Sequence, residues 1–120
     1  MIEEDYVSFE TAKLLKGVGF DQNCATYYLD GQVWCHCHGE VIPKNKQIYA
    51  APTHQNVKRW LLKNYNIFIC VFFMEDLNGF GYTIEDVVNK KCIASSGVSS
   101  YKEPEEACEA AIKYCLENFI

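Results

Sequence analysis

The feature that most constrains this chain is a helical pattern that leads directly into an unbroken apolar run. Apolar side chains recur at the spacing of one helical face, at Val57, Trp60, Leu61 and Tyr65. The run that follows, residues 67–74, holds eight consecutive apolar residues, too few to cross a bilayer as a helix. Because it is rich in β-branched and aromatic residues and no polar residue interrupts it, we expect a central strand covered on both faces.

Residues on both sides of this unit predict where its parts begin and end. Pro52 is tolerated just before a helix, and Thr53 is a good N-cap because its hydroxyl can accept a hydrogen bond from a first-turn amide. Asn66 is a plausible helix stop. Residues 76–79 end in Asn-Gly, the strongest short hairpin signal, and the alternation in residues 80–84 predicts a partner strand.

The rest of the chain supplies further short elements. We expect a helix through Lys16 with Ser8 as its N-cap, and a second helix at residues 103–120. Strands are expected at 25–29, 32–36 and 48–51, with a weak edge strand at 92–98. Asp30-Gly31 predicts a two-residue turn, and Pro104 suits the first position of the last helix. The expected fold is therefore α+β, with three helices packed on an antiparallel sheet of about four or five strands, in a single domain over residues 1–120.

Composition limits the function classes. An apolar content of 49% is that of a globular protein, and the net charge of −5 with a single arginine argues against binding to a nucleic acid polymer. The acidic start, Met1-Ile2-Glu3-Glu4-Asp5, has neither the basic nor the apolar region of a signal peptide. We therefore expect a cytoplasmic protein that does not associate with membranes.

Cysteine is unusually frequent for a chain of this length. Seven cysteines are an odd number, and several occupy apolar positions, so we interpret them as reduced thiols that act as small core residues. The run Cys35-His36-Cys37-His38 suggests zinc as an alternative. On a strand, however, its side chains alternate between opposite faces, and no second pair with zinc-ligand spacing follows. We expect no metal and no other cofactor, and a small zinc-binding protein is the third hypothesis below.

Three segments resemble a group of short acidic proteins encoded by phages and mobile elements of gut bacteria, most of them uncharacterised. The segments are Ser8-Phe9-Glu10-Thr11-Ala12 with Leu15 and Gly19-Phe20, Ala51-Pro52-Thr53 before Trp60-Leu61, and Glu105-Glu106-Ala107 continuing to Asn118. The resemblance covers both ends and the middle, and residues 33–47 depart most from it. It implies a phage-encoded accessory protein that acts against host defence, but it carries no catalytic motif.

Motifs for catalysis are missing from the sequence. Nucleophilic catalysis needs a nucleophile, a base and an orienting group, and sequence adjacency of Cys and His does not bring them together. The chain has neither a glycine-rich phosphate loop nor a dinucleotide fingerprint. We therefore expect a protein that is not an enzyme.

The start of the central helix is the best candidate for a ligand site. Free amides and the helix dipole favour an anion there, and two basic residues lie on the next turn. Aromatic and imidazole side chains elsewhere offer surfaces for stacking and hydrogen bonds. The candidate ligand-binding residues are Trp34, His36, Thr53, His54, Gln55, Lys58, Arg59 and Tyr82. The alternative is a capped surface helix with solvated charges, with Trp34 and Tyr82 in the core.

Two functions follow as hypotheses besides zinc binding. The first is an anti-defence protein that binds and sequesters a small nucleotide-derived immune signal, of the cyclic-nucleotide or ADP-ribose type, in the bacterial host cell. The alternative is a protein–protein inhibitor or interaction module that acts on a host protein. We also expect a homodimer, formed through the edge strand at residues 92–98 or the hairpin at 25–36.

Overall fold

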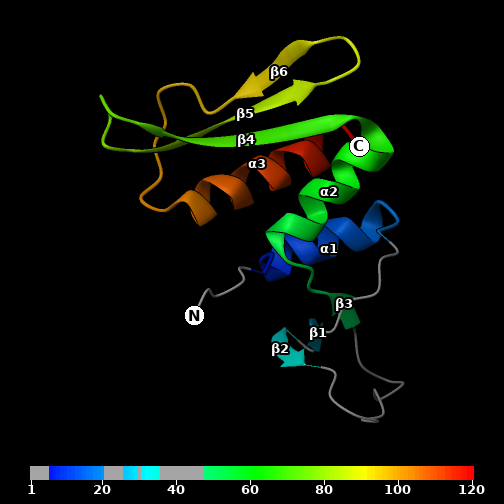
Figure 1. Cartoon of the computed structure of the whole chain (residues 1–120). Helices are drawn as coiled ribbons and strands as arrows, with labels where there is room; N and C mark the ends of the chain where they lie inside the picture. The colour runs from blue at the N-terminus through cyan, green and yellow to red at the C-terminus, as the bar shows by residue number, and fades with distance from the viewer. Residues whose placement is uncertain (1–5, 21–25, 30, 36–47) are drawn as a thin grey trace. The chain divides into compact units, whose positions relative to one another are not determined.

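The computed structural model describes residues 6–20, 26–29, 31–35 and 48–120, with only the backbone at 33–35. The chain separates into two compact units, Met1–Thr53 and His54–Ile120, and each is described by itself (Figure 1). The organisation as a single domain stays a prediction.

The first unit contains one helix and short antiparallel strands. They are α1 (Phe9–Gly17), β1 (Thr26–Leu29), β2 (Gln32–Cys35) and β3 (Ile48–Ala50), with the sheet order β2-β1-β3. Ser8 is the N-cap of α1, as predicted, because its hydroxyl accepts a hydrogen bond from the Thr11 amide at 3.2 Å. Gly31 has φ 81° between β1 and β2, which confirms the predicted hairpin turn.

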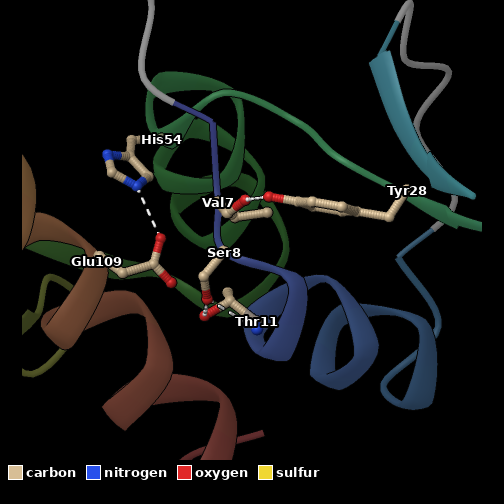
Figure 2. Close-up of polar contacts among 6 residues, drawn as sticks. All are labelled: Val7, Ser8, Thr11, Tyr28, His54 and Glu109. Atoms are coloured by element: carbon tan, nitrogen blue, oxygen red, sulfur yellow. Dashed lines mark hydrogen bonds and ion pairs between the residues drawn. The ribbon is translucent and has the colours of Figure 1, made fainter. Parts of the chain in front are cut away.

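Buried and half-buried contacts hold α1 and the sheet of this unit together. The buried Tyr28 hydroxyl donates a hydrogen bond of 2.7 Å to the Val7 carbonyl oxygen (Figure 2). The Phe9 ring meets the Tyr28 ring edge to face, with centroids 5.4 Å apart. Lys16 spans α1 and β3, since its Nζ donates to the Ile48 carbonyl oxygen at 3.3 Å and lies 4.9 Å from the Tyr49 ring centroid.

The second unit packs two helices on a three-stranded antiparallel sheet. Its elements are α2 (His54–Tyr65), β4 (Ile67–Met74), β5 (Gly79–Asp86), β6 (Lys91–Ser95) and α3 (Pro104–Asn118), with the sheet order β4-β5-β6. Helix α3 lies along β4 and β5, and α2 contacts β4 and α3 (Figure 1). The best-buried side chains of this layer are Val57, Leu61, Ile69, Ile84, Ala107, Ala111, Ile112 and Cys115.

Local turns of this unit follow the sequence signals. Asn66 ends α2 with φ 57° and Asn78 has φ 48° in the turn before β5, and asparagine adopts this left-handed conformation more readily than most residues. Pro104 is the first residue of α3, and the edge strand expected at residues 92–98 is β6. The α+β class is confirmed: in the described residues, three helices accompany five antiparallel strands of four or more residues, and the three-residue β3 pairs with β1. The strands form two sheets, however, where one was expected.

The prediction that residues 67–74 form a central strand covered on both faces is wrong. In the described part of the chain, strand β4 is an edge of its sheet, and only Ile67 and Ile69 of its eight side chains are buried. Phe68 and Phe72 of the opposite face are 42% and 38% exposed, and Phe73, on the same face as Ile67 and Ile69, is 54% exposed near the end of the strand. The reason is that α2 and α3 provide one helical layer. An uninterrupted apolar run does not reveal how many layers the remainder of the chain can supply.

Two adjacent leucines of α2 test this packing. Leu61 is fully buried and Leu62 is 39% exposed, so the same substitution to alanine should have very different effects. We expect Leu61→Ala to lower the free energy of unfolding by about 3 kcal/mol, through lost burial and the cavity left behind. Leu62→Ala should cost less than about 1 kcal/mol. Urea denaturation followed by circular dichroism measures both values, and equal losses would contradict the assigned helix face.

Candidate functional site

The first two turns of α2 bring together four of the predicted ligand residues, His54, Gln55, Lys58 and Arg59. His54 and Lys58 are four positions apart and share one line along the helix, and Gln55 and Arg59 share the next. Gln55 and Arg59 are exposed, whereas His54 and Lys58 are half-buried. Helix α2 therefore presents an imidazole, an amide and two cationic side chains within a short stretch of surface.

Glu109 of α3 is the partner of His54, and sequence reasoning missed this contact. His54 Nε2 lies 2.9 Å from Glu109 Oε1, and the two side chains are only 12% and 24% exposed (Figure 2). No sequence signal could have indicated the pair, because the residues are 55 positions apart.

The ion pair holds His54 in its charged form at neutral pH. Burial alone would lower the pKa of the imidazole, because it penalises the charged ring. Hydrogen bonds with Cys108 and Glu109, together with the negative charge of the Glu109 carboxylate, outweigh burial and raise the pKa to about 9. The start of α2 thus carries an imidazolium, but the carboxylate of Glu109 already balances its charge.

Cys108, His54 and Glu109 are the residue types of a nucleophile, a base and an orienting acid. One observation argues against that use. Cys108 is only 7% exposed, which leaves its thiol little access to a substrate. We interpret the group as a structural link between α2 and α3, and the absence of enzymatic activity stays a prediction.

The remaining predicted ligand residues lie in different surroundings. Thr53 precedes α2 and forms an isolated antiparallel bridge with Tyr6. Tyr82 is a buried core residue of β5, and burial is the main reason why its pKa is raised. Trp34 lies in β2 opposite Tyr27, and His36 falls outside the described residues. Within the described part, the structure thus places Tyr82 in the core, the alternative considered for this residue.

The structure describes four of the cysteines and only the start of the candidate zinc-binding run. Cys70, Cys92, Cys108 and Cys115 are free thiols, and burial raises the pKa of Cys115 to about 12. Cys35 ends β2, and the rest of the run Cys35-His36-Cys37-His38 lies outside the described residues. Among the residues that are described, no three or more His, Cys, Asp or Glu side chains gather in a way that could hold a metal ion.

Two surface hollows in the described part of the chain could hold a small ligand by their volume. Neither hollow is lined by a predicted ligand residue. One, of about 340 Å³, lies at the turn between β5 and β6 and is lined by Glu85, Asp86, Val87, Lys90, Lys91 and Cys92. The other, of about 200 Å³, lies between α1 and β3 of the first unit. Gln55, Lys58 and Arg59 therefore border neither hollow.

The open face of the β4-β5-β6 sheet is a second candidate surface, which sequence reasoning assigned to the core. On β4 it carries Phe68, Cys70, Phe72 and Met74, which we call the β4 face. Their partners on β5 are Glu85, Thr83, Gly81 and Gly79. An added Cβ at Gly81 would lie 2.7 Å from Ser96 Oγ and 2.9 Å from the Met74 sulfur, and one at Gly79 would lie 2.8 Å from Ser100 Cβ, so both glycines are covered. The open part of the β4 face is thus an aromatic strip with Glu85 and Thr83 beside it.

Comparisons with known proteins identify no relative of this chain. No protein-family model matches this chain, and no curated protein or solved structure resembles it significantly. In the described residues, none of the helices is long and apolar enough to span a membrane.

The His54–Glu109 pair predicts a pH-dependent stability. The pKa of His54 is about 9 in the folded protein, against 6.5 for an unperturbed histidine. Its contribution to stability is therefore complete below pH 6.5 and is lost as the pH rises through 9. We expect the free energy of unfolding to fall by about 2 kcal/mol across this window, the pair being partly solvated. Urea denaturation at several pH values measures this fall.

Glu109→Gln provides the matched control, because it keeps the shape of the side chain and removes its charge. The fall in the free energy of unfolding above pH 6.5 should become clearly smaller in this variant, and smaller still in His54→Gln. Parallel pH profiles of the original chain and both variants would show that the pair does not titrate as described.

Proposed function

We propose that the protein is a non-enzymatic interaction module that binds another protein through its β4 face. The supporting observation is the exposure of Phe68 and Phe72 on one face of a strand whose other face buries Ile67 and Ile69. Exposed aromatic side chains on one face favour a protein-binding surface, because large rings contribute most of the energy of protein interfaces.

The chemistry of the chain narrows the partner. A net charge of −5 favours a basic partner surface, and Glu85 lies beside Phe68 on the same face. The resemblance to short phage proteins supports a role in the bacterial cytoplasm as an inhibitor of a host protein. The partner that fits best is therefore a host protein with a basic, partly apolar surface.

The double variant Phe68→Thr/Phe72→Thr tests this function. Threonine suits a strand and removes both rings from an already exposed face, so folding should persist. We expect a host protein that is retained stoichiometrically by the original chain to be retained at least about tenfold less by the variant, since two aromatic anchors are lost. Affinity capture from bacterial lysate measures the retention.

Val98→Thr is the control, since Val98 is a highly exposed apolar residue outside the β4 face. It should retain the partner as the original chain does. Equal capture by all three chains, or by none, would contradict binding through the β4 face.

A second function is favoured by the charges at the start of α2. The imidazolium of His54, Lys58 and Arg59 lie within two turns of the helix end that attracts anions. This supports sequestration of a small nucleotide-derived signal, of the cyclic-nucleotide or ADP-ribose type. We place it second because Glu109 already balances His54 and because Tyr82 is buried.

A thermal-shift screen separates the two functions. A ligand that binds only the folded protein raises the unfolding temperature, so cyclic nucleotides or ADP-ribose should do so in the original chain. Lys58→Gln/Arg59→Gln should abolish the shift, whereas Lys63→Gln, in the last turn of α2, should preserve it. The absence of a shift with every nucleotide, or a shift that the double variant retains, would rule out this site.

A further inference from the structure

The two edges of the β4-β5-β6 sheet differ in how they are protected against pairing with another chain. Strand β6 is five residues long and begins at Lys91, and a register shift interrupts its pairing with β5. Short length, lysine and irregular register are the devices by which natural edge strands avoid new partners. The β6 edge is thus protected in three ways.

Strand β4 has none of these features. Its eight residues contain neither a charged residue nor a proline, and it pairs with β5 in one continuous register from Ile67 to Met74. In the described part of the chain, β5 is its only strand partner. Such an edge, about 26 Å long at the usual rise per residue, presents a row of unpaired amides and carbonyls.

We propose that β4 pairs edge to edge with β4 of a second copy of this chain, which joins two three-stranded sheets into one antiparallel sheet of six strands. The arrangement has closed two-fold symmetry, and its outer edges are the two protected β6 strands. It goes beyond the proposed function, because it uses the backbone groups at the edge of β4, although the side chains of the β4 face lie beside the axis.

Charges beyond the two ends of β4 favour a second copy in antiparallel orientation. Exposed Glu75 and Asp76 directly follow the strand, and exposed Lys63 lies just before it, in the last turn of α2. Antiparallel pairing brings the acidic end of each strand to the end that carries Lys63 of the other copy. Parallel pairing would instead place the acidic residues together, at a cost in a chain of net charge −5.

Symmetry also restricts the register. A two-fold axis perpendicular to the sheet keeps each face on its own side, so one residue of β4 must lie opposite its own copy. The middle of the strand is Cys70 and Val71. With Cys70 on the axis, Phe68 lies opposite Phe72 of the second copy on the open face. This register gives two aromatic cross-strand pairs, which stabilise antiparallel sheets.

The proposed interface differs from the dimer interface expected from the sequence, which stays a prediction. The sequence favoured residues 92–98 or the hairpin at 25–36 as the dimer edge. Strand β6, which occupies the first of these ranges, is the protected edge of its sheet. Pairing through β4 would also make the two β4 faces one continuous surface with four exposed phenylalanine rings.

Mass measurement with matched lysine variants tests the interface. The original chain should sediment at twice 13.8 kDa at micromolar concentration. Cys70→Lys places two lysines opposite each other at the axis and should shift the mass to 13.8 kDa. Thr83→Lys is the control: Thr83 pairs with Cys70 on the same face, but β5 is an interior strand, so the dimer should persist. Circular dichroism confirms that both variants fold.

Disulfide trapping and charge exchange provide tests that leave the strand edge unchanged. In a chain with serine at positions 24, 35, 37 and 92, mild oxidation should form a covalent dimer through Cys70, and Cys70→Ser should abolish it. Lys63→Glu should weaken the dimer several-fold, and adding Glu75→Lys and Asp76→Lys should restore it. A mass of 13.8 kDa for the original chain, or a dimer that survives Cys70→Lys, would overturn the proposal.

Discussion

One-sided burial of the β4-β5-β6 sheet is the constraint on which the second unit depends. Ile69 of β4 and Ile84 of β5 are a cross-strand pair, and both are fully buried together with Ile112 of α3. The unit has two helices, and both contribute to the same layer. Because side chains alternate along a strand, Ile67 and Ile69, the residues that β4 buries, leave a neighbour on the open face. The exposure of Phe68 between them is thus a direct consequence of how the core is built.

The His54–Glu109 pair shows how tertiary packing changes the role that is inferred for a side chain. Alone at a helix start, a histidine followed by two basic residues would favour an anionic ligand. Packed against α3, His54 stays charged because a carboxylate lies within hydrogen-bond distance, and that carboxylate satisfies the charge internally. The anion-attracting character of this helix end therefore rests mainly on Lys58, Arg59 and the helix amides.

The two edges of the β4-β5-β6 sheet differ, and the unprotected edge belongs to the strand that carries the β4 face. Strand β4 has a long edge with backbone amides and carbonyls, and exposed aromatic rings lie beside this edge. When a strand is added to a sheet, backbone hydrogen bonds of this kind provide affinity and side-chain contacts provide specificity. At the other edge, Lys91 and the interrupted register discourage the same contact. Association with a copy and binding of a partner would then use adjoining but distinct surfaces of one strand.

Local signals in the sequence determined where elements begin and end. Ser8 caps α1, Asn66 ends α2, and Pro104 opens α3 at the positions that backbone preferences and first-turn hydrogen bonds predict. These preferences act over a few neighbouring residues, so the sequence contains them in full. The α+β class followed from the same periodicities. Within the candidate site, the grouping of His54, Gln55, Lys58 and Arg59 was likewise predictable, because one helix carries all four.

Only the tertiary structure decided which surfaces are free. An apolar run such as Ile67–Met74 has the same local pattern whether one or two layers cover it, and the number of layers depends on how distant segments pack. The partition of strands into two sheets, the burial of Tyr82 and the pairing of His54 with Glu109 depend on that same packing. The physical reason is that burial and electrostatic pairing join residues far apart in the chain, and local conformational preference carries no information about them.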